Sequence, residues 1–424
     1  MMRVLATLVT LAILGTAPAA AATWTSPAPV PGSNGVGFPY DAAAWRDGTT
    51  AVAFIRDGIR VALRAPGGRW TPAERVSRND TGVAAPDVAV DAAGEVIVAW
   101  TQNTVHGAAP SQGPVYIRVA IRSAGGQWSA PHTVGRTRHL VDGQPRLAAN
   151  ASGDAVLAWR GVRPTGARDL LQATYRRAAG VFGAAQSLRE PGTDLQVALD
   201  DRGTAFAVWS HPRPPSRVAS SIRLATRAPT GAWTRPQTIY ADSAGAPQLA
   251  VPGDGPLLLA WRGAQVGVGA TRTGFAMLAE RTPDGITTEP LLLSHTRTPG
   301  PQLAANAAGE AVVAWTASSE ALDPTAGAPV LSAAARPRGG AFGPVQTAAG
   351  LRAGPLAMFA DGTAITVWNG TGLRAAARPP GGAFTTAETI ASRGDFPVLA
   401  AGDDLAVAVW LDRGRLMAAA RART

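Results

Sequence analysis

A short pattern of apolar and polar positions recurs along this chain. Its clearest copy is Pro86-Asp-Val-Ala-Val-Asp91-Ala-Ala-Gly94-Glu-Val-Ile-Val-Ala-Trp100. An Asp side chain bonds the backbone two residues on, and glycine tolerates positive φ, so Asp91 to Gly94 predicts a tight turn between strands at 87–90 and 96–100. Because the second strand is apolar at every position, we expect both of its faces to be buried between stacked sheets.

The aromatic residue that ends this second strand recurs in eight units, roughly 50 residues apart, as is typical of four-stranded propeller blades. The eight positions are Phe54, Trp100, Trp159, Trp209, Trp261, Trp315, Trp368 and Trp410. We expect these side chains to pack between blades. Sugar stacking is the alternative, but it requires an exposed ring face.

The second half of each unit predicts a third strand that ends in arginine, a turn, and a fourth strand opened by an aromatic residue, as at Arg64, Pro66-Gly67-Gly68 and Trp70. The chain ends in a third strand, 416–421, that has no fourth, and it begins with an unpaired strand at 24–30. Pairing the two would complete the last blade and remove a free sheet edge. The sequence therefore predicts an all-β fold, a closed propeller of four-stranded antiparallel blades. Eight blades are expected, and seven are the alternative if one unit is degenerate or inserted.

Residues 1–22 have a charged start at Arg3, an apolar run to Leu14 and a small-residue end at Ala20-Ala21-Ala22, which is typical of a secretory signal peptide. We expect a secreted, extracellular protein in which 23–424 form a single domain. Cysteine is absent, so packing alone must stabilise it. The repeats lie near 39–76, 86–134, 145–188, 195–239, 247–293, 301–348, 355–390 and 396–424, with 24–30 completing the last.

The net charge is +10, and all 39 basic residues are arginine. These arginines are spread through every repeat, which favours the codon bias of a GC-rich genome over a phosphate-binding surface. No later segment reaches the roughly 18 apolar residues that a membrane span needs. We therefore expect a monomer with neither a nucleic-acid partner nor a membrane insertion.

One face of the ring carries the variable loops. Those after the second strand are long in units two to six, at 101–114, 160–169, 210–221, 262–273 and 316–329, and short in units one, seven and eight, which predicts a cleft. The loops that join successive blades open on the same face and hold acids, arginines and histidines suited to a sugar or a carboxylate. The candidate binding residues are Arg78, Asp80, Arg138, His139, Asp142, Arg189, Glu190, Asp194, Tyr240, Asp242, His295, Arg297, Arg393 and Asp395.

Individual catalytic motifs are weak. Ser210 and His211 are neighbours on an extended backbone and should point apart, so they do not form a nucleophile and base pair. Arg393-Gly394-Asp395 spells an adhesion tripeptide that chance explains in a chain this rich in Arg and Gly. We expect no cofactor and no side-chain metal site, because Asp91-Ala-Ala-Gly94 lacks the alternating oxygen ligands of a calcium loop. A calcium ion held by carbonyl groups in the channel stays open.

The units resemble those of secreted bacterial propellers, loosely the NHL-like and sialidase-like groups. The stretch Val88-Ala-Val-Asp91-Ala-Ala-Gly94 is similar to NHL units, which usually place an acidic residue where Trp100 stands. Sialidase units have a different spacing between Asp, Gly and Trp, and their Phe-Arg-Ile-Pro opening is absent. The resemblance implies the propeller fold, and no catalytic residue is carried over.

Two functions remain open. The first is a secreted, non-catalytic module that binds a glycan or an extracellular protein on the long-loop face, by analogy with other propellers. The second is a glycan-active hydrolase or lyase that uses a histidine or a carboxylate pair in the axial funnel, with Asp142, Glu190, Asp194 and Asp242 as candidates. Two carboxyl groups about 5 to 10 Å apart would favour the enzyme.

Overall fold

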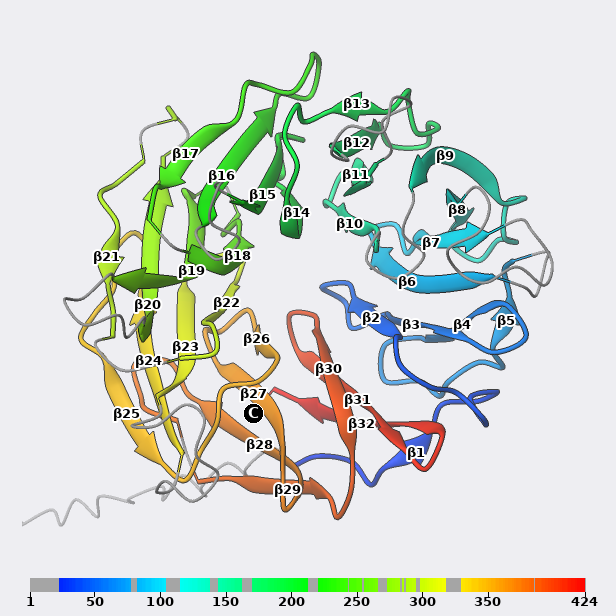
Figure 1. The fold of residues 1–424 in the computed structure, drawn as a ribbon. Helices are drawn as coiled ribbons and strands as arrows, with labels where there is room; N and C mark the ends of the chain where they lie inside the picture. Colours follow the sequence, from blue (N-terminus) through cyan, green and yellow to red (C-terminus); the bar gives the residue numbers. More distant parts are fainter. Residues whose placement is uncertain are drawn as a thin grey trace, which may run out of the picture.

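The computed structural model describes residues 23–77, 82–103, 115–137, 144–161, 170–212, 220–242, 244–253, 255–265, 273–282, 284–285, 287–294, 298–317, 329–384 and 386–423. The predicted signal peptide at 1–22 lies outside them. The described residues form 32 strands, which pair into eight four-stranded antiparallel sheets arranged as a ring (Figure 1). They contain no helix that could cross a membrane.

Each of the first four blades contains four consecutive strands, and the first of these is innermost. They are β2 (Asp41–Ala44), β3 (Thr50–Ile55), β4 (Ile59–Arg64) and β5 (Glu74–Arg75); β6 (Val83–Val90), β7 (Val96–Asn103), β8 (Val115–Arg122) and β9 (His132–Thr137); β10 (Arg146–Ala149), β11 (Ala155–Arg160), β12 (Leu171–Arg176) and β13 (Gln186–Ser187); β14 (Thr193–Leu199), β15 (Ala205–Pro212), β16 (Ser220–Arg227) and β17 (Gln237–Tyr240).

Blades five to seven repeat this order, and blade eight takes its outer strand from the N-terminal end of the described chain. They are β18 (Ala244–Ala250), β19 (Leu257–Gln265), β20 (Thr273–Arg281) and β21 (Leu291–Leu292); β22 (Gln302–Ala305), β23 (Ala311–Ala317), β24 (Val330–Arg336) and β25 (Gln346–Ala349); β26 (Leu356–Met358), β27 (Ala364–Gly370), β28 (Gly372–Arg378) and β29 (Glu388–Ala391); β30 (Asp395–Ala401), β31 (Leu405–Asp412), β32 (Arg415–Ala422) and β1 (Ala28–Pro29).

The ring closes as the sequence predicts. Each inner strand contacts the inner strand of the next blade, and β30 contacts β2. In the last blade, β1 pairs with β32 in the register Ala28 to Ala418, and further backbone hydrogen bonds from Thr25 and Val30 extend the pairing. The prediction of an eight-bladed propeller completed by its N-terminal strand is confirmed.

The recurring aromatic residues fill the spaces between blades. Phe54 and the tryptophans at 100, 159, 209, 261, 315, 368 and 410 are all buried, and none is more than 6% exposed. Each buried aromatic ring removes about 150 to 250 Å² from water. A ring buried on both faces cannot stack on a sugar, so this set is the core of the propeller and not its binding site.

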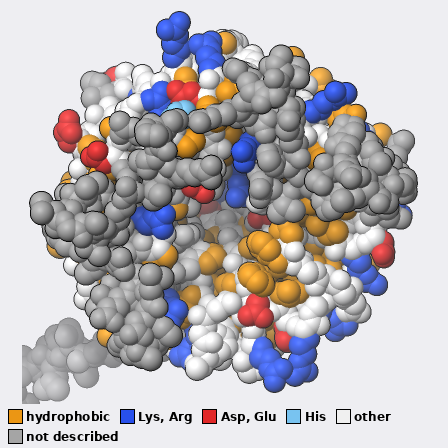
Figure 2. All heavy atoms as spheres, viewed as in Figure 1, with side chains coloured by type: hydrophobic (Ala, Val, Ile, Leu, Met, Phe, Trp, Pro, Cys, Tyr) orange, Lys and Arg blue, Asp and Glu red, His pale blue; other side chains and the backbone are white. Residues whose placement is uncertain are grey.

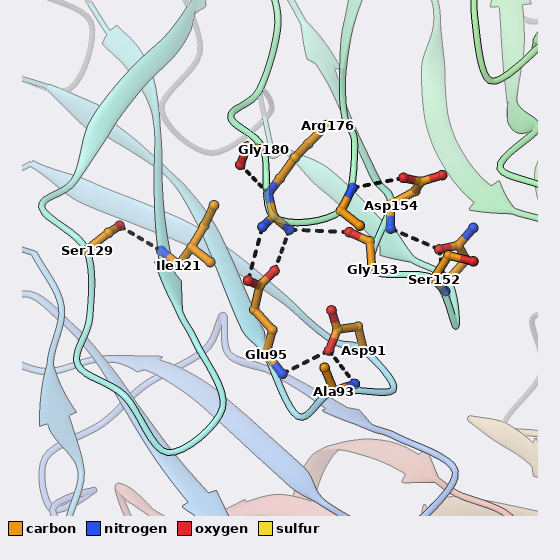
Figure 3. A network of polar contacts seen from close by, with 12 residues as sticks. Asp91, Ala93, Glu95, Ile121, Ser129, Ser152, Gly153, Asp154, Arg176 and Gly180 are labelled. Carbon is orange, nitrogen blue, oxygen red and sulfur yellow. Dashed lines mark hydrogen bonds and ion pairs between the residues drawn. The ribbon is translucent and has the colours of Figure 1, made fainter.

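The tight turns join neighbouring blades as well as neighbouring strands (Figure 3). In the second blade, Asp91 Oδ1 accepts hydrogen bonds from the backbone N–H groups of Ala93 and Glu95, at 2.9 Å each. The carboxylate of Glu95 then forms a bidentate ion pair with Arg176 of the third blade, whose side chain is only 2% exposed. Glu95, the residue after this short turn, therefore links the second blade to the third.

The second strand is longer than the sequence indicates in several blades. The strands β7, β15 and β19 continue past their tryptophan to Asn103, Pro212 and Gln265. The loops expected to begin at 101, 210 and 262 therefore start later. The reason is that Thr101 to Asn103 and their equivalents pair with a third strand that also extends, so polar residues continue the ladder.

Candidate functional site

The inner strands of blades two, four, five and eight begin with an irregular turn at the long-loop face. Each has a shift in pairing register and a non-glycine residue at positive φ, namely Ala85, Asp194, Ala246 and Phe396. The left-handed region is costly for residues with a side chain, and residues in this conformation are more frequent at functional sites than elsewhere. The bulge re-aims these side chains away from the regular strand.

Phe396 reaches an aromatic partner from the other end of the chain. It stacks on Phe38, which precedes β2, with the ring centroids 5.0 Å apart and the planes at 27°. Tyr40 meets Phe38 edge-on and donates its hydroxyl hydrogen to Phe396 O at 2.5 Å. Burial raises the pKa of Tyr40, so its hydroxyl stays protonated and keeps that hydrogen bond. We call the stacked pair Phe38 and Phe396 the aromatic platform.

The aromatic platform is exposed although both residues are large and apolar. Phe38 is 59% exposed and Phe396 is 54% exposed. Figure 2 shows hydrophobic side chains gathered beside the central hollow, over the region that β2 and β30 occupy in Figure 1. An apolar patch at the rim of a hollow is typical of a binding surface.

A ring of equivalent positions lies on the inner strands, four residues before each short turn. In every blade this residue pairs with the one that precedes the buried aromatic, for example Asp41 with Ala53 and Asp87 with Ala99. We call this set the inner ring. It consists of Asp41, Asp87, Arg146, Gln196, Gln248, Gln302, Pro355 and Val398. The ring is thus polar in blades one to six and apolar in seven and eight.

Two carboxyl groups meet within the inner ring. Asp41 Oδ2 accepts a hydrogen bond from Val88 N at 2.9 Å, which places the Asp41 carboxyl group beside Asp87, the residue before Val88. Burial and the neighbouring Asp41 charge raise the pKa of Asp87, because two carboxylates in contact cannot both ionise readily. Arg146 Nη1 lies 3.6 Å from Asp87 Oδ2 on the other side.

Glu190 lies in a cluster between the third and fourth blades. Arg223 donates to its carboxylate from Nε, at 2.9 Å, and from Nη2. His211 Nδ1 lies 3.6 Å from Glu190 Oε2 and 2.9 Å from the carbonyl oxygen of Pro191. A carbonyl only accepts, so Nδ1 carries the hydrogen and a neutral His211 presents Nε2 as its basic nitrogen.

Asp194 lies beside a second small cluster. Ser210 donates to Asp194 Oδ2 at 3.0 Å, whereas His211 turns toward Glu190, so the neighbours point apart as expected. A Cβ on Gly245 would lie 3.5 Å from Arg262 Nη2 and 4.0 Å from both Asp194 Oδ2 and Ser210 Oγ. Glycine at this position therefore leaves a small polar recess at the bulge.

Tyr240 and Asp242 form a further pair of predicted site residues. Tyr240 packs against Trp261 at 5.5 Å, and burial followed by the Asp242 charge raises the pKa of its phenol. Arg189, Asp242, Arg393 and Asp395 are exposed. Seven predicted residues, Arg78, Asp80, Arg138, His139, Asp142, His295 and Arg297, lie outside the described residues.

The opposite end of the channel is spanned by an ion pair. Arg46, in the short turn of the first blade, lies 3.4 Å from Asp201 in the short turn of the fourth. A cavity of about 210 Å³ lies here, lined by turn residues from seven of the eight blades, including Trp45, Asn306 and Asp403. Blades one and four are not neighbours, so this contact joins two separated blades of the ring.

No group of three or more His, Asp or Glu side chains that could hold a metal ion is found within the described part of the chain. The polar groups that converge at the channel are carboxyl, guanidinium and amide groups. These groups hydrogen-bond well to hydroxyl groups and to carboxylates.

The aromatic platform and the inner ring are absent from the residues that the sequence singles out. The inner ring has a signal, since its members stand four residues before each turn, but the pattern is visible only after all eight units are aligned on their turns. The platform has a weaker signal, an aromatic residue before proline in units one and eight. Both Phe38-Pro39 and Phe396-Pro397 fit it.

Comparisons with known proteins do not assign the chain to a family. No protein-family model and no curated protein matches the chain. Among solved structures, the polysaccharide lyase Uly1 is 9% identical with a TM-score of 0.48, covering 93% of this chain and 91% of that one. The β-propeller domain of the trilobed protease from Pyrococcus furiosus is 7% identical with a TM-score of 0.47, covering 79% and 95%. The α-L-arabinofuranosidase Arb93A from Fusarium graminearum is 12% identical with a TM-score of 0.42, covering 66% and 92%.

Proposed function

We propose that this propeller is a secreted binding protein that takes a glycan at its long-loop face. The observation that carries the proposal is the exposed aromatic platform of Phe38 and Phe396 at the rim of the channel. The C–H face of a sugar ring is apolar and carries slight positive charge, so it pairs well with the negative face of an aromatic ring. A stacked pair offers a wide, flat surface for that contact.

The inner ring supplies the polar half of such a site. Phe38 and Asp41 are three residues apart, so their Cα atoms are separated by at most about 11 Å. The platform and the ring are therefore close enough for one disaccharide to touch both. Carboxyl, guanidinium and amide groups both donate and accept hydrogen bonds, which suits sugar hydroxyl groups.

Glycan-array binding with the purified protein tests this function. Phe38→Ala and Phe396→Ala are each expected to weaken binding by at least about tenfold, the loss of one well-placed contact. The matched control is Val181→Ala, since Val181 is 78% exposed in a turn of the third blade, away from the platform. Wild-type affinity in both Phe variants would rule out the platform as the binding surface.

A glycan-active hydrolase or lyase is the second candidate, favoured by one observation. The ring of His211 is held with Nδ1 against Pro191 O and near Glu190, which leaves Nε2 free to act as a general base. The arrangement of the carboxyl groups does not favour a hydrolase. Asp87 is buried and faces Arg146, and the carboxylate of Glu190 is engaged by Arg223.

A cleavage assay on every glycan that the protein binds separates the two functions. Catalysis predicts new reducing ends or unsaturated products that disappear in His211→Gln, while binding of the intact glycan survives. If no bound glycan yields new reducing ends or unsaturated products, the function is binding without catalysis.

A further inference from the structure

Arg262 is an exposed arginine at the long-loop face that pairs with none of the described residues. It lies on β19, directly after the buried Trp261, and its guanidinium has no hydrogen bond or ion pair to another residue in the described part of the chain. The segments that follow β15 and β19, 213–219 and 266–272, contain no Asp or Glu. The planar array of donors on a guanidinium matches the two oxygens of a carboxylate, so Arg262 is suited to an anionic ligand.

Two glycines leave space for the Arg262 side chain. A Cβ on Gly274 would lie 2.7 Å from Arg262 Cδ, so a side chain there would displace the aliphatic part of the arginine from β20. A Cβ on Gly245 would lie 3.5 Å from Arg262 Nη2. Neither glycine has a φ in the left-handed region, so the backbone conformation does not require glycine at either position. What both positions provide is room around Arg262.

The space above Gly245 is bordered by a carboxylate and a hydroxyl group as well as by the guanidinium. Asp194 Oδ2 and Ser210 Oγ would each lie 4.0 Å from a Cβ on Gly245. Asp194 Oδ2 accepts hydrogen bonds from Ser210 Oγ at 3.0 Å and from Ala246 N at 3.5 Å, whereas Asp194 Oδ1 accepts none from the described residues. We call this space and the side chains of Arg262, Asp194 and Ser210 the polar recess.

The backbone beside the polar recess adopts a costly conformation in two neighbouring blades. Asp194 has a φ of 52° and Ala246 a φ of 50°, and each lies at a shift in pairing register. Residues with a side chain adopt this conformation more often at functional sites than elsewhere. The junction of blades four and five lies across the ring from the junction of blades eight and one, which carries the aromatic platform (Figure 1).

Resting on the proposed function, we propose that the polar recess binds the carboxylate of an acidic sugar, so that the glycan recognised by this protein contains hexuronate. Arg262 holds the sugar carboxylate, and Asp194 Oδ1 accepts a hydrogen bond from a hydroxyl group of the same sugar. The Asp194 charge repels a bare anion, whereas a sugar brings it a hydroxyl donor. The aromatic platform stacks on a different sugar, because it lies on the other side of the ring.

Matched pairs of oligosaccharides test this inference. Each pair consists of a hexuronate oligosaccharide and the same chain after its carboxyl groups are reduced to primary alcohols, a change that removes the charge and keeps the ring hydroxyl groups. Binding of both forms is measured by calorimetry with the purified protein. Wild type is expected to bind the carboxylate form at least about tenfold more tightly, the gain from one well-placed contact.

Two variants of the polar recess and a matched control complete the experiment. Arg262→Met removes the charge and keeps the aliphatic part, and Gly245→Ala places a methyl group in the recess at ordinary contact distance. Both should bring the ratio of the two affinities close to one while the reduced form binds as it does to wild type. Arg160→Met should leave the ratio unchanged, because Arg160 follows Trp159 as Arg262 follows Trp261 but is not part of the recess.

Arg262→Lys takes the place of Arg262→Met if the latter does not melt cooperatively, since lysine lacks the planar fork and should also lower the ratio. A wild type that binds both forms alike, an unchanged ratio in the Arg262 variant, or an equal loss in Arg160→Met would overturn this inference. The proposed function stands in each of these cases if Phe396→Ala still weakens glycan binding. If the wild type binds no glycan, both fail.

Discussion

The guanidinium of Arg46 lies 3.4 Å from the carboxylate of Asp201, although the two residues belong to blades one and four, which are not neighbours in the ring. Their side chains are 41% and 37% exposed, so solvent screens the attraction. The ion pair is therefore expected to add little to the stability of the ring.

Asp201→Asn is accordingly expected to change the free energy of unfolding by less than about 1 kcal/mol, as for other exposed ion pairs. Urea denaturation of wild type and variant checks this. A loss of more than about 2 kcal/mol would show that the contact stabilises the ring.

Glu95→Ala should lower the free energy of unfolding much more, because it leaves the buried guanidinium of Arg176 without its carboxylate partner. Removing one partner of a buried pair costs roughly 3 to 5 kcal/mol. Glu74→Ala is the matched control, since Glu74 is 42% exposed and lies 3.9 Å from Arg122, and its cost should stay below about 1 kcal/mol. Equal effects in parallel urea titrations would contradict the role given to the buried pair.

Phe396→Gly should separate binding from stability. The substitution removes an exposed ring, which costs about 1 kcal/mol of stacking, and it relieves a positive φ that costs a residue with a side chain about 1 to 2 kcal/mol. We expect the free energy of unfolding to stay within about 1 kcal/mol of wild type while glycan binding is lost. A matched pair of calorimetric melts and binding isotherms measures both, and a large drop in stability would show that the ring supports the fold.

The paired carboxyl groups predict a pH dependence of stability. The pKa values of Asp41 and Asp87 are raised in the folded state, first by burial, so the folded protein holds protons more tightly than the unfolded chain does. Their contribution is therefore fully present below the unfolded value of 3.8 and is lost as the pH rises through the folded pKa values. The melting temperature of Asp87→Asn should gain on that of wild type as the pH is raised from 4 to 8. A constant difference across that range would show that burial and the neighbouring charge do not raise these pKa values.

The sequence by itself determines the architecture, because each blade repeats the same local physics. The turn residues at Asp91 and Gly94 and the apolar strand that ends at Trp100 recur closely enough to count eight units. The unpaired strand near Val30 predicts the closure, since a free sheet edge must find a partner. None of these inferences needs a contact between distant blades.

The site is decided by tertiary structure, because it is built from residues that only ring closure brings together. Glu190 meets Arg223 and His211 through the pairing of neighbouring blades, which the loop sequence does not reveal. Phe38 stacks on Phe396 only because the last blade packs against the first. Hydrophobic periodicity specifies which residues enter a strand. Which side chains then face one another across the channel depends on blade number and closure, and these place residues hundreds of positions apart at one mouth.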